Sequence, residues 1–326
     1  MNSNPRTPAG CFFRFMLAVS TLLSAAFAQE MFDAPQILPR THSFARSSKA
    51  AIRTNVDLVL VPVTVLDHSD RPVSGLQADN FTILDNQHPQ SIKYFSSEDA
   101  PISLTVILDA SGSMAGRMDE ARQAVVELFN SSNPQDDLRM ITFGDQVRAV
   151  GNLSDSLDDV HRTVASIQAD GFTALWDAMY LGVTELQSAA QRRKTIVLIS
   201  DGGDNHSRYT QQEIKSLLEE SDVRVYAIGL FDRTARRFEE RMGPLRLDEV
   251  TSATGGRLFS VHDRSDLQHA LSQISLEVRN QYLLGYYPSS RERDGKWRHI
   301  KVKVNQSVTR AKLRLYAKKG YYGPTE

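Results

Sequence analysis

The chain has 326 residues, of which 41% are hydrophobic and 24% are charged. This composition is typical of globular proteins and excludes a largely disordered chain. The formal net charge of −1 and the mixing of both signs give no electrostatic case for binding nucleic acid or an anionic membrane. The partner must therefore be inferred from particular sites.

Residues 1–28 have the pattern of a secretory signal peptide. Arg6 and Arg14 precede the apolar run FMLAVSTLLSAAFA, which is shorter than the ~20 residues that span a bilayer and ends in a small-x-small sequence. We therefore predict cleavage after residue 28 and an exported protein, secreted or periplasmic in the cell envelope, without a stable membrane span. An uncleaved anchor is the alternative. The only cysteine, Cys11, would be lost with this segment, so core burial rather than disulfides must stabilise the fold.

Two segments of different character follow. Residues 29–50 contain two prolines and no sustained periodicity, which indicates a linker. β-branched residues and turn residues dominate residues 51–98, where Asp85-Asn86 separates two short strand-like runs. We predict a small β module in this stretch.

From residue 100 to residue 278, strand-like and helix-like stretches alternate, which predicts an α/β fold with a doubly wound, mostly parallel sheet. The expected strands are 102–108, 137–143, 194–200, 223–230 and 257–261. The expected helices are 117–132, 156–168, 174–190, 211–221, 247–254 and 266–278. The tight turn Gly144-Asp145 predicts a hairpin, and hence one antiparallel strand at an edge of the sheet.

Residues 231–246 follow a predicted strand and are expected to form a charged loop at the ligand-binding edge of the sheet. The loop carries the arginines Arg233, Arg236, Arg237, Arg241 and Arg246. We predict that this loop selects an acidic partner. A solvated turn packed through Phe238 and Met242 is the alternative.

Residues 279–326 return to a β pattern. Lys301 and Lys303 alternate with valines, which indicates a solvated strand face rather than a nucleic-acid patch. The tyrosines of this segment are interpreted as core residues or cross-strand pairs: Tyr286, Tyr287, Tyr321 and Tyr322. Because the flanks of an inserted domain tend to meet where its termini emerge, we expect this segment to pack with residues 51–98.

Oxygen-bearing side chains follow two of the predicted strands. Asp109, Ser111 and Ser113 come directly after the first strand of the α/β segment, and Asp201 comes directly after a later one. Ligands of an open parallel sheet bind beyond the carboxyl ends of its strands, so we expect these side chains to lie close together. Thr173 precedes a predicted helix, where a hydroxyl can point into the same crevice.

These five candidate ligands offer oxygen atoms only. Such a donor set suits a hard divalent cation, Mg²⁺ before Ca²⁺ or Mn²⁺. Two carboxylates and three neutral hydroxyls leave the ion underneutralised, so a carboxylate from another molecule could complete its coordination.

In order and context, the Asp109-x-Ser111-x-Ser113 stretch, Thr173 and Asp201 resemble the metal-ion-dependent adhesion site of the von Willebrand factor type A fold. The resemblance covers roughly residues 100–278. The flanks, with RPVSGLQADNFTILDN and YLLGYYPSSRERDGKWRHIKVKV, resemble those of bacterial exported proteins with a von Willebrand factor type A-related domain. The resemblance implies a Rossmann-like fold and metal-dependent, non-catalytic binding of a protein partner.

Two other functions stay open. A metal-dependent phosphohydrolase could use Asp109 as its nucleophile, although Ser111 stands where that chemistry usually needs a second acid. The second open function is that of a structural subunit whose metal site is vestigial. Phe172 and Trp176 could form an apolar rim for a partner, but packing of the following helix is the preferred interpretation. Asp204 is interpreted as a turn residue, and His206 as an exposed loop residue.

Overall fold

The computed structural model describes residues 58–97, 99–152, 157–231, 238–290, 292–305 and 312–325. The predicted signal peptide, the linker and residues 51–57 of the predicted β module lie outside the described residues. Among those that are described, no helix is long and apolar enough to cross a membrane.

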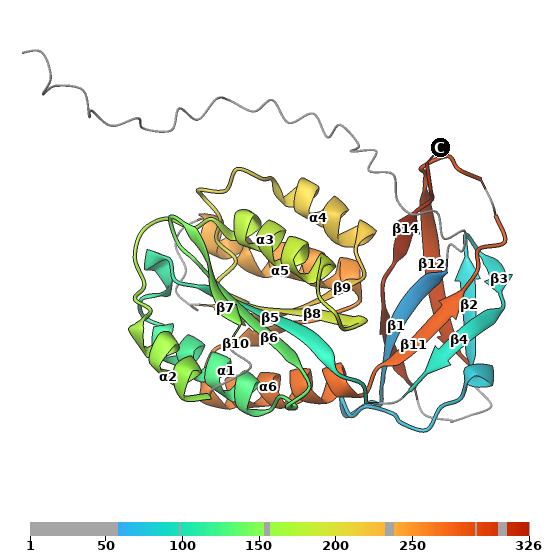
Figure 1. Ribbon diagram of the computed structural model, residues 1–326, viewed down its shortest axis with the longest axis horizontal. Helices are drawn as coiled ribbons and strands as arrows, with labels where there is room; N and C mark the ends of the chain where they lie inside the picture. Colours follow the sequence, from blue (N-terminus) through green and yellow to red (C-terminus); the bar gives the residue numbers. More distant parts are fainter. Residues whose placement is uncertain are drawn as a thin grey trace, which may run out of the picture. The chain divides into compact units, whose positions relative to one another are not determined.

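A six-stranded sheet in the order β10-β9-β8-β5-β6-β7 forms the centre of the α/β part (Figure 1). Its strands are β5 (Ile102–Asp109), β6 (Asp137–Phe143), β7 (Val147–Asn152), β8 (Arg193–Ser200), β9 (Val223–Leu230) and β10 (Leu258–Val261). Every residue of β5 and β9 is buried, as expected for strands covered on both faces. All neighbours pair in parallel except β6 and β7, which confirms the predicted sheet and its antiparallel edge strand.

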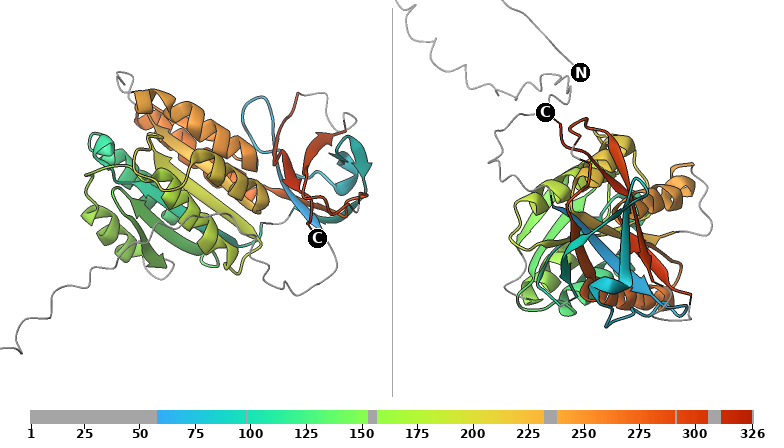
Figure 2. Two further views of the ribbon diagram at one scale, coloured as in Figure 1. Left: turned by 90° about the horizontal axis from the view of Figure 1, so that it is seen from above. Right: turned by 90° about the vertical axis from the view of Figure 1, so that its right-hand side faces the viewer.

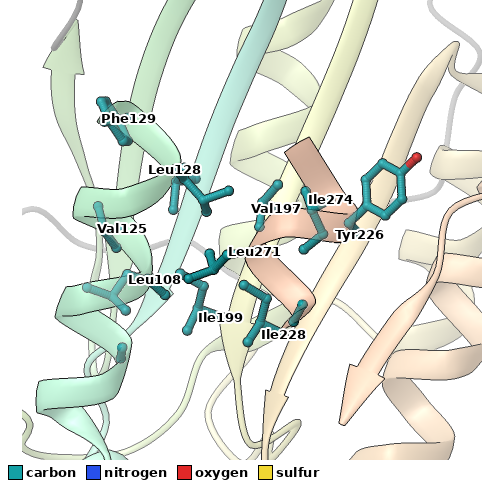
Figure 3. Close-up of a cluster of buried hydrophobic side chains, with 14 of the residues drawn as sticks. Leu108, Val125, Leu128, Phe129, Val197, Ile199, Tyr226, Ile228, Leu271 and Ile274 are labelled. Atoms are coloured by element: carbon teal, nitrogen blue, oxygen red, sulfur yellow. The ribbon is translucent and has the colours of Figure 1, made fainter. Parts of the chain in front are cut away.

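Helices cover both faces of this sheet. They are α1 (Met118–Asn130), α2 (Leu157–Ser166), α3 (Leu175–Gln187), α4 (Gln211–Glu220), α5 (Phe238–Thr254) and α6 (Arg264–Arg279). Helices α3, α4 and α5 lie on one face, and α1, α2 and α6 lie on the other. Figure 3 shows the core under α1 and α6, where Val197 and Ile228 of the sheet share a buried cluster with Val125 and Leu271 of the helices. Burial of these apolar faces is the main force that holds the layers together.

Helix α5 corrects one prediction. Residues 238–246 are helical and do not belong to a loop, so the helix begins nine positions before the predicted residue 247. Gly243 and Pro244 disfavour a helix interior, yet both lie inside α5. The helix persists because Leu247 and Val250 bury its central turns in the core, which outweighs local propensity. Arg233, Arg236 and Arg237 lie outside the described residues.

The remaining strands form a β-sandwich of two four-stranded sheets, in the orders β13-β1-β11-β4 and β14-β12-β2-β3. The strands are β1 (Val59–Leu66), β2 (Phe81–Asp85), β3 (His88–Gln90), β4 (Ile92–Ser96), β11 (Tyr282–Tyr286), β12 (Trp297–Val304), β13 (Arg314–Ala317) and β14 (Gly320–Tyr322). Both sheets combine strands from before and after the α/β part (Figure 2): these alternate in the first sheet, and β12 pairs with β2 in the second. We propose that residues 51–98 and 279–326 form this module around an α/β domain of residues 100–278.

The short helices η1 (Ala78–Asn80) and η2 (Gly112–Met114) complete the described elements. Between β2 and β3, Asn86 and Gln87 have φ values of 45° and 69°, which suits a two-residue hairpin turn with left-handed residues. This turn ends β2 next to the predicted break at Asp85-Asn86.

Candidate metal centre

The first loop of the site leaves the carboxyl end of β5. Asp109 is the last residue of this strand and is fully buried. The backbone N–H of Ser111 donates to Asp109 Oδ1 at 3.0 Å, which bends the chain back over the carboxylate. Helix η2 follows at once and brings the hydroxyl oxygens of Ser111 and Ser113 to 3.1 Å from each other. The local turn therefore gathers three of the predicted ligands.

The loop after β8 lies beside this first loop because β5 and β8 are adjacent and parallel. The hydroxyl of Ser200 donates to Asp109 Oδ2 at 2.6 Å. The next residue, Asp201, accepts a hydrogen bond from the backbone N–H of Gly203 at 2.8 Å. Two carboxylates separated by 92 positions in the sequence thus lie near each other at the carboxyl ends of adjacent strands, close enough for the charge of Asp201 to raise the pKa of Asp109.

Thr173 is held by the loop that contains Asp201. Its backbone N–H donates to Asn205 Oδ1 at 2.8 Å, and its carbonyl oxygen accepts from the backbone N–H groups of Asn205 and His206, each at 3.0 Å. Thr173 is also 4% exposed. Among the described residues, the side chain of Thr173 forms no hydrogen bond with Asp109 or Asp201, so its place at the site follows from these backbone bonds.

The Thr173 loop is fastened to the first loop as well. Gly112 N–H donates to the carbonyl oxygen of Gly171 at 3.1 Å, and Asp170 N–H donates to that of Ala110 at 2.9 Å. The backbone of Gly171 has a φ of +78°, a conformation that favours glycine. Hydrogen bonds between backbones thus position the loops before any ligand binds.

The two carboxylates of the candidate metal centre lie close together without a neighbouring positive charge among the described residues. Burial, and then the neighbouring charge of Asp201, raise the pKa of Asp109 to about 7, while hydrogen bonds from Ser111 and Ser200 act in the opposite direction. Within the part of the chain that the structure describes, no Lys, Arg or His nitrogen forms an ion pair with Asp109 or Asp201. Two nearby carboxylates without a cation are costly to bury, and a divalent ion would remove that cost.

The donor set fits a hard cation. The candidate ligands offer carboxylate and hydroxyl oxygens, and across the described residues no group of three or more His, Cys, Asp or Glu side chains is placed to hold a metal ion. With only two carboxylates, the hydroxyls of Ser111, Ser113 and Thr173 would have to supply further oxygens. Water or a partner would supply the remainder.

An aromatic side chain borders the site. Phe172, directly before Thr173, is 58% exposed, and its ring stacks on that of His206 with centroids 5.2 Å apart. Trp176 is 3% exposed and packs in the core under α3 and α4. The preferred interpretation, packing of the following helix, is therefore right for Trp176 and wrong for Phe172.

Several residues that support the site were not singled out from the sequence. Ser200 and Asn205 bond to two of the predicted ligand residues, but both contacts join distant loops and leave no local pattern. Asp204 was interpreted as a turn residue; its Oδ1 accepts from the N–H of Leu175, the first residue of α3, at 3.0 Å. This bond links the loop after β8 to the start of α3, where N–H groups lack partners within the helix.

Helix α5 contacts the loop after β8 through Gly243, which lies against Gly202. A Cβ atom at Gly202 would lie 2.6 Å from the Cα atom of Gly243, and one at Gly243 would overlap the carbonyl oxygen of Asp201. Arg246, one turn further along α5, lies close enough to Asp204 for its charge to lower that residue's pKa, against the larger raising effect of burial. Helix α5 therefore supports the backbone that carries Asp201.

A doubly wound sheet with a candidate cation site at the carboxyl ends of its strands defines the class of the α/β part. The family model for the von Willebrand factor type A domain matches residues 103–273, and the chain belongs to this family.

Relatives and solved structures are similar at low sequence identity. The human inter-alpha-trypsin inhibitor heavy chain H4 is 25% identical over 243 residues, which cover 68% of this chain and 25% of that protein. An uncharacterised protein of Synechocystis is 21% identical over 185 residues, which cover 55% of this chain and 42% of the relative. The von Willebrand factor type A structure from Catenulispora acidiphila is 12% identical, with a TM-score of 0.48, and the match covers 84% of this chain and 76% of that one. The chain spans about a quarter of the length of the heavy chain.

Proposed function

We propose that this chain is a non-catalytic protein-binding module, acting outside the cytoplasm in adhesion or assembly, whose binding depends on a divalent cation. The observation that carries the proposal is the convergence of Asp109, Ser111, Ser113, Thr173 and Asp201 on one edge of the sheet. Mg²⁺ is the cation that best suits this set, because it accepts few protein ligands and retains water. A bound cation would supply the positive charge that a carboxylate of the partner needs.

Membership of the von Willebrand factor type A family supports a binding role. The human relative is named as a heavy chain of an inhibitor, which agrees with a binding role. The apolar run in residues 1–28 supports export.

A binding role also agrees better than a phosphohydrolase with the surroundings of Asp109. Both of its carboxylate oxygens accept hydrogen bonds, Oδ1 from the N–H of Ser111 and Oδ2 from the hydroxyl of Ser200. These bonds hold the carboxylate in place and suit a ligand, whereas a phosphohydrolase would also need an acid two positions further on for proton transfer. Ser111 offers no such acid.

The test measures metal binding and partner binding together. Isothermal titration calorimetry with MgCl₂ should give heat for the native chain and none for Asp109→Ala or Asp201→Ala, while circular dichroism stays unchanged. Immobilised protein should then retain a surface protein in Mg²⁺ and release it in EDTA. Retention by Asp109→Ala in EDTA would refute the metal-dependent mechanism. Turnover of phosphoesters that Asp109→Asn abolishes would establish the phosphohydrolase instead.

A further inference from the structure

The two outer faces of the β-sandwich have different surroundings. The outer face of the β1 sheet is covered by the α/β part: Thr64 is fully buried, and Arg224 of β9 donates to Thr64 Oγ1 and to the carbonyl oxygen of Pro62, each at 2.6 Å. The outer face of the β14-β12-β2-β3 sheet is open. Strand alternation and register show which side chains point outward from this sheet. They are Thr82, Leu84, Pro89, Trp297, His299, Lys301, Lys303 and Tyr322. We call it the β12 face.

One end of the β12 face is aromatic. The indole of Trp297 lies against Gly320 of β14, where a Cβ atom would be 2.7 Å from the ring atom Cε2. The ring of Tyr322 meets that of Trp297 edge-on, with centroids 5.0 Å apart. Trp297 Nε1–H donates to His299 Nδ1 at 3.2 Å. These contacts fix the indole on the sheet, and Tyr322 remains 38% exposed beside it.

The other end is cationic. Lys301 and Lys303 are exposed and follow Trp297 and His299 on the same side of β12. Same-side residues of a strand repeat every ~6.6 Å, so the row extends for about 20 Å. None of the side chains assigned to the β12 face is acidic, and among the described residues neither lysine forms an ion pair. The face therefore combines ring surfaces with uncompensated positive charge along one line.

We propose that the β12 face binds a linear anionic polysaccharide. Lys301 and Lys303 would pair with carboxylate, sulfate or phosphate groups of the chain, and Trp297 and Tyr322 would contact the apolar faces of its sugar rings. A row of side chains along one strand fits an extended polymer. A bilayer is a poorer fit because Trp297 is half-buried against Gly320 and cannot insert.

Tryptophan fluorescence gives a direct test, because the chain has only two tryptophans and Trp176 is buried in the core of the α/β part. Titrating the full chain with polygalacturonate or dextran sulfate should shift the emission, whereas neutral dextran should not. The Trp176→Phe variant should keep the shift. Lys301→Glu combined with Lys303→Glu should weaken binding at least tenfold, and Trp297→Ala should weaken it in affinity electrophoresis.

The matched control is Lys93→Glu combined with Lys312→Glu, which makes the same change in charge at exposed lysines elsewhere on the sandwich. This control should bind the polysaccharide like the native chain. Neither EDTA nor Asp109→Ala should change polysaccharide binding, and this result would separate the β12 face from the candidate metal centre. An equal loss in the control pair would overturn the proposal. So would the absence of any response to the anionic polysaccharides, or tighter binding to oligothymidylate or phosphatidylglycerol vesicles.

Discussion

At the scale of single residues, the candidate metal centre depends on two glycines that touch. Gly243 of α5 leaves no room for a Cβ atom, which would overlap the carbonyl oxygen of Asp201, whereas a Cβ atom at Gly116 would meet nothing within 4 Å. We expect Gly243→Ala to displace Asp201, to lower Mg²⁺ affinity at least fivefold in calorimetry, and to cost about 1–3 kcal/mol of unfolding free energy. Gly116→Ala is the control and should change neither quantity. Native Mg²⁺ affinity in Gly243→Ala would show that α5 does not support the site.

Phe172 permits a complementary prediction about the partner. Its exposed ring stacks on His206 beside the site, and its hydrocarbon side chain has no oxygen atom with which to bind a cation. The partner is the surface protein that EDTA releases from the immobilised chain. Phe172→Ala should weaken its binding by about 1–3 kcal/mol, the usual effect of removing an aromatic contact at an interface. The affinity for Mg²⁺ should not change. Leu276→Ala, at an exposed residue of α6, serves as the control. If Phe172→Ala binds the partner as the native chain does, this aromatic border takes no part in recognition.

At the scale of elements, the two sheets of the sandwich are joined by a buried carboxylate. Asp85 Oδ2, at the end of β2, accepts from the hydroxyl of Tyr286 in the opposite sheet at 3.0 Å and from that of Tyr321 at 2.8 Å. Burial raises the pKa of both tyrosines, that of Tyr321 to about 12, so both remain protonated donors. Asp85→Ala would leave two donors without their acceptor, and we expect it to cost about 2–4 kcal/mol in urea unfolding. Tyr322→Phe should cost little, and a native midpoint for Asp85→Ala would contradict this role.

Local patterns predicted most elements but not how they meet. Buried apolar runs predicted β5, β8 and β9, and the turn at Gly144-Asp145 predicted the antiparallel edge strand, since each signal lies within a few residues. The early start of α5 was missed because Gly243-Pro244 breaks the local pattern, while the packing that stabilises the helix involves distant residues. The hydrogen bond from Ser200 to Asp109 was missed for the same reason. The convergence of the strand-end residues was predictable only because topology dictates it.

At the scale of the whole described chain, the sandwich and the candidate metal centre lie at opposite ends of the parallel strands. Arg224, which contacts β1, is the second residue of β9, and Arg257, which pairs with Asp70 at 3.4 Å, precedes β10. The candidate ligands Asp109 and Asp201 instead lie at the carboxyl ends of β5 and β8. Strands of eight residues separate these ends by roughly 25 Å at ~3.3 Å per residue.

This separation predicts that docking of the sandwich and metal binding can be perturbed independently. Arg224 is 2% exposed and donates two hydrogen bonds of 2.6 Å to the sandwich, so Arg224→Ala should cost about 3 kcal/mol of unfolding free energy in urea. The affinity for Mg²⁺ should not change, because no candidate ligand bonds to this region. Arg162→Ala, whose side chain is 78% exposed, provides the control for loss of an arginine. A fall in Mg²⁺ affinity in a folded Arg224→Ala chain would show instead that the sandwich and the candidate metal centre are energetically coupled through β9 and its neighbours.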